Sequence, residues 1–436
     1  MKRKIAMVGL SITLLFTACH NKQEDTSTAK GNQEEADVVV IEESKPKKPE
    51  FIDITISAVG DIIVHSPQLT AQYFDDTYCF KNNFEFVKPY LQSADLMLGN
   101  LEITFGGSDL GYAGYPMFNT PDALAKALKQ AGFHGLATSN NHTLDTGKAG
   151  VIRTIDVVKE NSLIPFGTRR NTEEQSFSII DIKGVKVGLS AFTYETPRYG
   201  DFKTINAIPI PKDTEALIDT FSYEYLDEDL LKMKNRVEEM RANGAEVICF
   251  YLHWGHEYHK KPNPYQKKIA YELAEYGVDI IFGSHPHVLQ PIEIIEAEEN
   301  GKSNSTLVVY SLGNFLSNQR YEYLNNRSTE DGLIINVTLR KNLLNNDIQF
   351  NKISFVPTWV HKYRKNGRAV YEIIPLLDVL ENKEEYNLIS NDSIWRAENS
   401  KASTVAIIED ELNGVTAETP LYQKERYNYW HQYKLN

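Results

Sequence analysis

The feature that most constrains the fold is an alternation of short apolar segments with amphipathic ones between residues 52 and 340. Residues 52–59 and 246–252 are typical of buried strands, whereas 225–242 and 265–276 show the apolar spacing of helices. One face of the first of these helices would carry Leu226, Leu230, Met233, Val237 and Met240. Strands that alternate with helices in this way predict an α/β domain built from layers.

The N-terminus predicts export and lipid attachment. Three basic residues at positions 2–4 precede an apolar stretch at 5–16, which is too short for a transmembrane helix, so residues 1–18 are predicted to be a signal peptide. The small residues directly before Cys19 resemble a bacterial lipobox, which implies cleavage before Cys19 and diacylation of its sulfur. An ordinary secretory signal with an incidental Cys19 is the alternative.

The rest of the chain divides by composition into three predicted parts. Residues 19–50 are rich in charged and small polar residues and cannot bury enough apolar surface to fold, so we expect a flexible, lipidated tether. A folded domain then spans 51–380, and a polar extension spans 381–436. The predicted location is extracytoplasmic, with the protein held on a bacterial membrane by its lipid.

Charge and cysteine content exclude two classes of protein. The formal net charge is -13, with 59 Asp and Glu against 46 Lys and Arg, which argues against nucleic acid as a partner. The three cysteines, Cys19, Cys79 and Cys249, are too few for a disulfide framework and match no zinc-binding spacing.

Six short polar clusters follow predicted strands, each at the carboxyl end of its strand. They are GDIIVH at 60–65, GNLE at 99–102, SNNHTLD at 139–145, HWGHE at 253–257, GSHPH at 283–287 and SLGNF at 311–315. In open α/β sheets, ligands bind beyond the carboxyl ends of the strands. We therefore expect the six clusters to converge on one site.

The residue types in these clusters are those of a metal centre. Carboxylate, imidazole and amide groups suit one or two divalent ions of Mn, Fe, Zn or Mg. Two such ions about 3.5–4 Å apart can clamp a phosphoryl group. Taken singly, Asp61 could be a turn residue, Asn141 and His142 a loop cap, and His253 a core histidine, but coincidence at six strand ends is a poor explanation.

The order of the motifs GDxxxH, GNLE, NNHxxDxG, HWGxEY, GxHPHxxQ and YSLGNF resembles that of CapA/PgsA-type poly-γ-glutamate capsule proteins, over residues 52–317. That family is placed in the calcineurin-like metallophosphatase superfamily, so the resemblance implies a β-sandwich flanked by helices. It also implies metal-ligand roles for several residues and a substrate-facing role for His142. The implied metal ligands are Asp61, Asn141, His253, His285 and His287.

Two departures from the superfamily pattern bear on the chemistry. Where an aspartate usually bridges both metals, this chain has Asn100, and because a neutral amide bridges two cations poorly, either Glu102 takes over or one metal is lost. The histidine expected two residues after Asp61 is absent, and the nearest, His65, comes four residues after it. We assign Glu102 as a metal ligand, His142 as a catalytic proton donor, and Asp145 as the residue that orients His142.

Two functions remain open at this point. The first is the synthesis or handling of an anionic, poly-γ-glutamate-like capsular polymer, with a membrane polyglutamate synthase complex as partner. The second is a metal-dependent hydrolase that acts on an extracytoplasmic phosphoester. Whether the protein is an enzyme is left open by the sequence.

Overall fold

The computed structural model describes residues 50–299, 302–379, 381–409 and 415–417. The predicted signal peptide at 1–18 and the predicted tether, including Cys19 and all but its last residue, lie outside the described residues. Chain contacts divide the protein into residues 1–48 and residues 49–436, and everything described below belongs to the second unit. Among the described residues, no helix is both long and apolar enough to cross a membrane.

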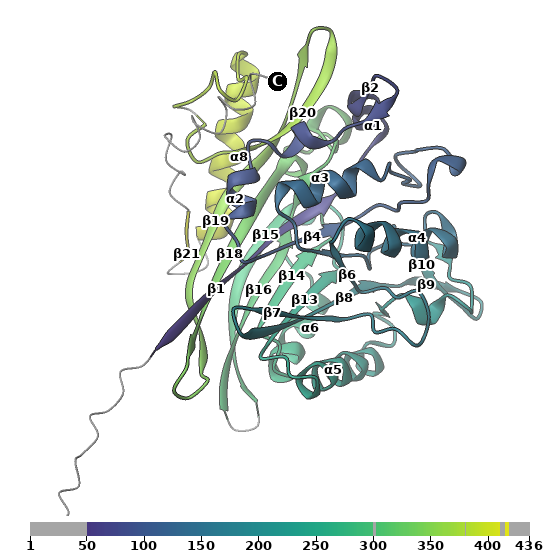
Figure 1. Ribbon diagram of the computed structural model, residues 1–436, viewed down its shortest axis with the longest axis vertical. Coiled ribbons are helices and arrows are strands. Elements are labelled where there is room, and N and C mark those ends of the chain that lie inside the picture. The colour runs from purple at the N-terminus through teal and green to yellow at the C-terminus, as the bar shows by residue number, and fades with distance from the viewer. Residues whose placement is uncertain (1–49, 300–301, 380, 410–414, 418–436) are drawn as a thin grey trace, which may run out of the picture. The chain divides into compact units, whose positions relative to one another are not determined.

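The first sheet joins a parallel half to an antiparallel half (Figure 1). Its strand order is β20 (Arg368–Pro375), β19 (Ile348–Lys365), β18 (Asp331–Asn342), β1 (Phe51–Ile62), β4 (Leu96–Leu101), β5 (Gly135–Ala137) and β6 (Ile164–Phe166). Two short strands complete it, β17 (Asn314–Leu316) beside β1 and β21 (Val415–Ala417) beside β19. Strands β1, β4, β5 and β6 run parallel, so their carboxyl ends lie at one edge.

The second sheet is built around four parallel strands. Its order is β12 (Thr220–Phe221), β8 (Val185–Tyr194), β13 (Val247–His253), β14 (Ile280–Ser284), β16 (Lys302–Leu312) and β15 (Leu289–Glu299), with β7 (Ser178–Ile182) beside β8. Strands β8, β13, β14 and β16 are parallel, and the short edge strand β12 also runs parallel to β8, whereas β15 and β7 are antiparallel to their neighbours. Strands β7 and β8 form a hairpin.

The two sheets pack face to face through one apolar layer. Ile54, Ile56 and Ala58 alternate along β1 and meet Cys249 and Tyr251 of β13 in the same buried cluster. Alternation places every second side chain of a strand on this inner face. Burial of such a layer is the main source of stability in a sandwich, at roughly 25 cal/mol per Å² of apolar surface. The predicted β-sandwich flanked by helices is therefore confirmed.

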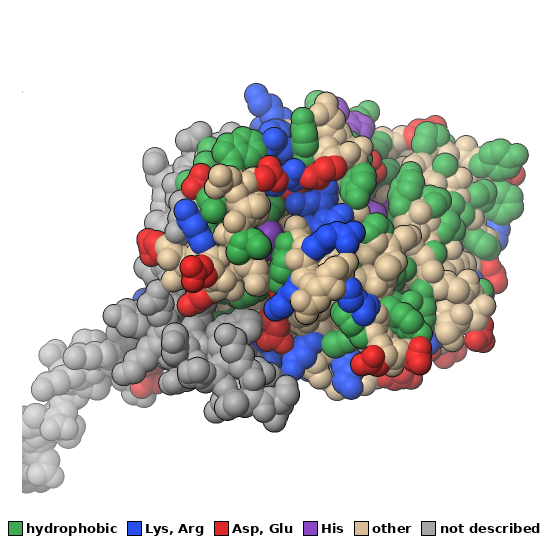
Figure 2. All heavy atoms as spheres, turned by 90° about the horizontal axis from the view of Figure 1, so that it is seen from above, with side chains coloured by type: hydrophobic (Ala, Val, Ile, Leu, Met, Phe, Trp, Pro, Cys, Tyr) green, Lys and Arg blue, Asp and Glu red, His purple; other side chains and the backbone are tan. Residues whose placement is uncertain are grey.

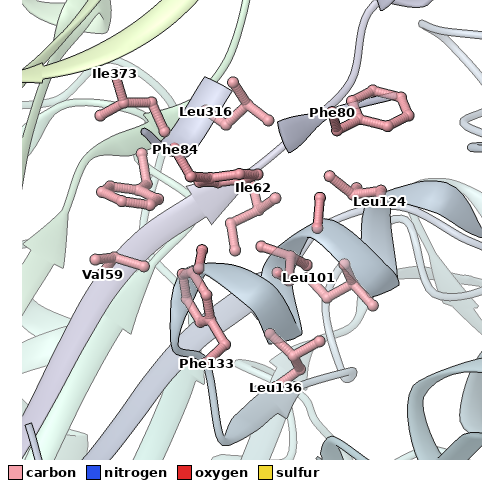
Figure 3. Close-up of a cluster of buried hydrophobic side chains, with 14 of the residues drawn as sticks. Val59, Ile62, Phe80, Phe84, Leu101, Leu124, Phe133, Leu136, Leu316 and Ile373 are labelled. Atoms are coloured by element: carbon pink, nitrogen blue, oxygen red, sulfur yellow. The ribbon is translucent and has the colours of Figure 1, made fainter. Parts of the chain in front are cut away.

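Helices cover the outer faces of both sheets. Helices α5 (Leu226–Ala242) and α6 (Pro264–Glu275) pack on the second sheet, and the five predicted apolar residues of α5 are all buried there. On the first sheet, α3 (Ala123–Ala131) contributes Leu124 to an apolar cluster that also holds Val59 and Phe133 (Figure 3). Helix α4 (Gly147–Glu160) covers the parallel half nearby. These helices hold the strands in register and thereby fix the edge where their carboxyl ends meet.

Shorter elements form the connections. They are α1 (Ser66–Gln72), β2 (Tyr73–Phe74), β3 (Thr77–Tyr78), η1 (Lys81–Phe84), α2 (Lys88–Gln92), η2 (Ser108–Leu110), β9 (Thr196–Tyr199), β10 (Phe202–Ile205), β11 (Ile208–Pro209), η3 (Glu215–Leu217), α7 (Tyr321–Leu324) and η4 (Arg327–Glu330). Two of them, α1 and α7, contribute residues to the cavity described below.

The segment that we predicted as a polar extension contains an ordered element. Helix α8 (Asn391–Glu409) contacts β19, and its Ala397 is buried together with Trp359 and Ile374. The same cluster includes Tyr386, which precedes the helix. The described part of residues 381–409 thus packs on the first sheet.

Candidate metal centre

The parallel strands of both sheets deliver buried polar side chains to the shared edge. Strand β1 carries Asp61 near its end, Glu102 directly follows β4, and His253 is the last residue of β13. The turn between β14 and β15 supplies His285 and His287. All five side chains are buried. Residues from four of the six polar clusters thus meet at this edge.

Close backbone contacts explain the glycines beside these residues. A Cβ atom added to Gly60 would lie 1.9 Å from the carbonyl oxygen of Gly313, and one added to Gly283 would lie 2.0 Å from that of Tyr310. Any side chain at these positions would push the strands apart and displace the neighbouring Asp61 or His285.

The turn that holds the two histidines is strained. His285 and His287 have φ angles of +94° and +55°, in a region that residues with side chains rarely adopt. Strain of this kind costs on the order of 1–3 kcal/mol per residue and persists where the surrounding structure enforces it. The conformation turns both imidazoles inward, since both side chains are buried in the cluster.

Two overlapping triads have the composition and spacing of metal sites. One consists of Glu102, His285 and His287, and the other of Asp61, Glu102 and His253. Within each triad, one candidate ligand atom per residue lies within 4.8 Å of the others. Glu102 belongs to both triads, so its carboxylate occupies the shared position that a bridging ligand would take.

Among the described residues, only one oxygen of the buried Glu102 carboxylate has a hydrogen-bond partner, since Oε2 accepts from the amide of Asn100 at 3.4 Å. The Oε1 atom lies 3.5 Å from Nε2 of His253 and 3.7 Å from Nε2 of His287, but has no hydrogen-bond partner among the described residues. Burial, together with the charge of Asp61, raises the pKa of Glu102 well above its usual range. A cation at this position would supply the missing partner.

Asp61 orients two of its neighbours. Its Oδ2 accepts a hydrogen bond from Nδ1 of His287 at 3.0 Å, and its Oδ1 accepts one from the amide of Asn100 at 2.8 Å. With Nδ1 as donor, His287 turns its other nitrogen toward Glu102. Burial lowers the pKa of His287, but the hydrogen bond and charge of Asp61 outweigh it and raise the pKa overall.

The other two imidazoles favour the neutral form that binds metals. Burial, followed by the charge of neighbouring histidines, lowers the pKa of both His253 and His285 well below the usual range. Nδ1 of His253 lies 2.9 Å from the hydroxyl of Ser284, and Nε2 lies 2.9 Å from Oδ1 of Asn141. Nδ1 of His285 has no hydrogen-bond partner in the described part of the chain.

These observations fit a divalent cation. Two buried carboxylates, three imidazoles and an amide oxygen lie together, and Glu102 and His285 each have an unpartnered atom. The residues that would hold the ion or ions are the six predicted ligands, Asp61, Glu102, Asn141, His253, His285 and His287. Imidazole ligands suit Zn and Fe, whereas carboxylates suit Mn and Mg, so this mixed set does not single out one of the four predicted metals.

The predicted catalytic pair stands beside the triads. Nδ1 of His142 lies 2.8 Å from Oδ2 of Asp145, which also accepts the backbone N–H of Phe118 at 2.6 Å. The ring of Phe118 packs edge-on against His142, with 4.6 Å between centroids. Asp145 thus fixes the orientation of His142, leaving Nε2 as the nitrogen that can exchange a proton.

A cavity of about 520 Å³ opens over this region. His142 and His287 line it together with Glu257, Tyr258 and Asn318. His65 lines the same cavity, but its Nδ1 accepts the backbone N–H of Asn318 at 3.2 Å, and burial lowers its pKa to about 4. His65 therefore belongs to the cavity wall and to neither triad.

Several residues of the site were not singled out by the sequence. Tyr194 places its ring 4.7 Å from that of His285, and Oδ1 of Asn314 lies 3.1 Å from Nδ1 of His287. Asn314 lies in the SLGNF cluster, so its motif pointed to the site although its role did not. Tyr194 ends β8 without a polar cluster and carried no such signal.

The fold and the cluster define a class: a two-sheet sandwich with a buried carboxylate–imidazole centre at one edge. Residues 55–319 match the family described as bacterial capsule synthesis protein PGA_cap, and the chain belongs to that family. The matched region contains every candidate metal ligand as well as His142 and Asp145.

Two relatives from Bacillus are similar to this chain over about two thirds of its length. A capsule biosynthesis protein CapA of Bacillus anthracis is 29% identical over 300 residues, which cover 66% of this chain and 64% of that protein. A PGA biosynthesis protein CapA of Bacillus subtilis (strain 168) is 28% identical over 305 residues, covering 68% of this chain and 71% of that protein. Among solved structures, a novel phosphatase of Mycoplasma pneumoniae aligns with a TM-score of 0.39 at 14% identity, covering 71% of this chain and 94% of that one.

Proposed function

We propose that this protein acts in the synthesis of an extracellular anionic capsule polymer of the poly-γ-glutamate type, through a divalent metal centre at the edge of its sandwich. The observation that carries the proposal is the family match, because it spans residues 55–319 and so includes the whole buried cluster. The names of the two Bacillus relatives, capsule and PGA biosynthesis proteins, support the same process.

The polymer proposal is tested in a strain from which the gene for this protein has been deleted and then reintroduced as wild type or variant. Wild-type protein should restore extracellular polymer, measured as glutamate released by acid hydrolysis of the high-mass fraction, and Glu102→Gln should not. Glu322→Gln is the matched control, because Glu322 is a half-exposed carboxylate outside the cluster. A deletion strain with unchanged polymer would contradict the proposed function, and full rescue by Glu102→Gln would show that the cluster is not needed.

Location and partners follow as part of the proposal. The lipobox-like sequence at Cys19 supports an anchor on the outer face of a membrane, where the partner would be a polyglutamate synthase complex. Cys19→Ser should move the protein from the membrane fraction to the soluble extracytoplasmic fraction. Retention of the variant in the membrane would refute lipid anchoring.

A metal-dependent hydrolase is the second candidate, favoured by the pair of His142 and Asp145. A bound divalent ion would polarise an ester oxygen and lower the pKa of a bound water. His142, which lines the cavity next to His287, could protonate a leaving oxygen while Asp145 holds its ring.

The hydrolase is tested with a generic phosphoester and added Mn²⁺. His142→Ala should keep the metal and lose the activity, by about 10²–10⁴-fold for a general acid. His285→Ala should lose both. Wild-type protein that binds metal but hydrolyses neither a phosphomonoester nor a phosphodiester would favour the polymer function alone.

A further inference from the structure

The hairpin between β19 and β20 carries a concentration of cations that is unusual in this acidic chain. Lys362, Arg364, Lys365 and Arg368 fall within seven residues, and the last three are exposed. Figure 2 looks down on the end of the molecule where this hairpin lies in Figure 1, and Lys and Arg side chains gather near the centre of that face.

What sets this hairpin apart from other basic segments is that four cations without a carboxylate partner among the described residues lie within seven residues. Elsewhere, exposed lysines such as Lys148, Lys212 and Lys268 lie within 3 Å of an Asp or Glu oxygen. Within the part of the chain that the structure describes, none of the four hairpin cations makes an ion pair. Their positive charge is therefore available to an outside ligand.

The structure holds these cations in place with uncharged groups. Arg364 donates to the carbonyl of Gly367 at 2.6 Å, and Arg368 lies over the ring of Phe74, 4.0 Å from its centroid. Lys362 lies over the rings of Tyr323 and Tyr371. Such contacts orient a cation without neutralising it.

Two cavities flank the hairpin. On one side, a groove of about 640 Å³ is lined by Lys365, Arg368 and Phe74. On the other side, Nζ of Lys362 lies 3.3 Å from both Oδ1 of Asn318 and the hydroxyl of Tyr323, and these two residues line the cavity over the metal centre. The hairpin cations thus extend from the lining of the groove to a contact with two residues that line the cavity over the candidate site.

Two acidic residues line this groove, Glu85 and Glu372, and the second opposes an anionic ligand only weakly. Burial raises the pKa of Glu372 to about 7, although hydrogen bonds such as that from Tyr363 at 3.0 Å act against the rise. Near neutral pH its carboxyl therefore carries only part of a negative charge.

From this arrangement we propose that the β19–β20 hairpin binds a carboxylate polymer and leads it to the cavity over the metal centre. Lys362 and Lys365 are three residues apart on one strand, about 10 Å, so the cations are spread rather than converging on one point. That spread suits a chain of regularly spaced single charges better than one compact anion. A net charge of -13 would otherwise repel such a polymer.

The proposal rests on the proposed polymer function and adds the surface through which the polymer is bound. The test measures binding of fluorescein-labelled poly-γ-glutamate to the full-length chain by anisotropy, at low and at high salt, with EDTA present so that the metal centre does not contribute. Removing three exposed cations by Arg364→Gln, Lys365→Gln and Arg368→Gln should weaken binding at low salt about tenfold. Added salt should weaken binding of the wild type more than that of the variant.

A control of equal charge separates a local site from a general effect. Lys148→Gln, Lys212→Gln and Lys268→Gln remove three cations that are exposed but paired with carboxylates, and binding should stay within about twofold of wild type. Equal loss in both triple variants, or wild-type binding by the hairpin variant, would overturn the proposal. Neither result would contradict the proposed polymer function, which the complementation experiment with Glu102→Gln tests separately.

An anionic membrane is the competing ligand for exposed cations. Flotation with phosphatidylcholine vesicles, with and without phosphatidylglycerol, isolates the contribution of anionic lipid from that of any anchor. Phosphatidylglycerol should increase vesicle binding of the hairpin variant and of wild type by the same amount. If the hairpin variant binds polyglutamate like wild type but gains no vesicle binding from phosphatidylglycerol, the hairpin contacts the membrane surface and the proposal is overturned.

Discussion

Two buried carboxylates in this protein, Glu330 and Glu102, differ in how their hydrogen-bonding capacity is satisfied. Around Glu330, Oε2 accepts from Arg320 at 2.9 Å and from the indole of Trp359 at 3.0 Å, while Oε1 accepts from Arg396 at 3.2 Å. At the sandwich edge, Glu102 is equally buried, but its Oε1 has no hydrogen-bond partner among the described residues and no lysine or arginine pairs with it there.

The difference separates a structural network from a binding site. A buried carboxylate that is surrounded by donors is compensated within the fold, and it ties α8, η4 and β19 together. The buried carboxylate of Glu102 gains no counter-charge from His253 and His285, whose pKa values are lowered, and a bound cation would supply one. Burial alone does not distinguish the two, whereas hydrogen-bond satisfaction does.

The largest effect on stability is expected at the satisfied network. Glu330→Ala leaves Arg320 buried without its carboxylate and should lower the free energy of unfolding by about 3–5 kcal/mol, whether or not metal is present. Chemical denaturation with and without EDTA measures this. Glu322→Ala is the control, because Glu322 is half exposed and its loss should cost under about 1 kcal/mol. If both variants lose the same free energy of unfolding, Glu330 is not a special structural carboxylate.

Asp331 provides an intermediate case, a buried carboxylate that accepts a hydroxyl hydrogen bond from Ser403 at 2.6 Å. Burial raises its pKa from 3.8 to about 7. The folded protein therefore keeps this proton at pH values where the unfolded chain has released it, so stability should fall as pH rises from about 4 to about 7.

Asp331→Asn should remove that part of the pH dependence, which amounts to a few kcal/mol. Denaturation midpoints at a series of pH values measure it. The exposed Asp347→Asn should leave the slope unchanged. If Asp331→Asn retains the wild-type slope, the carboxyl of Asp331 is ionised in the fold and the assignment is wrong.

The smallest of these effects on the free energy of unfolding is expected from Glu102→Gln, which should slightly stabilise the metal-free protein. Because burial raises the pKa of Glu102, its ionised form destabilises the fold above the pKa of the unfolded chain, and an uncharged amide avoids that cost. Part of the gain is offset because the amide accepts the hydrogen bond of Asn100 less well than a carboxylate does. Denaturation in EDTA near neutral pH should show a variant at least as stable as wild type, whereas a strongly destabilised variant would make Glu102 a structural residue.

The sequence predicted the strands and the polar clusters at their ends because both signals are local. The apolar run before His253 and the face of Leu226 to Met240 need no knowledge of the partner sheet. Convergence of the clusters followed from parallel strand direction, which the alternation of strand and helix implies.

What the sequence did not predict depends on contacts between distant segments. Helix α8 is too polar to be recognised from composition, and its position follows from packing against Trp359. Strand β19 continues to Lys365 because β20 pairs along its second half. Tyr194 reaches His285 only because β8 and β13 are neighbours, and no motif marks that approach.

The central claim is that the edge cluster binds a divalent ion with Glu102 as one of its ligands. Measuring metal content tests it most directly. Full-length protein is incubated separately with Mn²⁺, Fe²⁺, Zn²⁺ and Mg²⁺, dialysed, and analysed by inductively coupled plasma mass spectrometry beside Glu102→Gln and Glu322→Gln. Wild type and Glu322→Gln should each retain at least one ion per chain, and Glu102→Gln should retain far less. Wild-type protein that retains none of the four metals, or Glu102→Gln that retains as much as wild type, would contradict the claim.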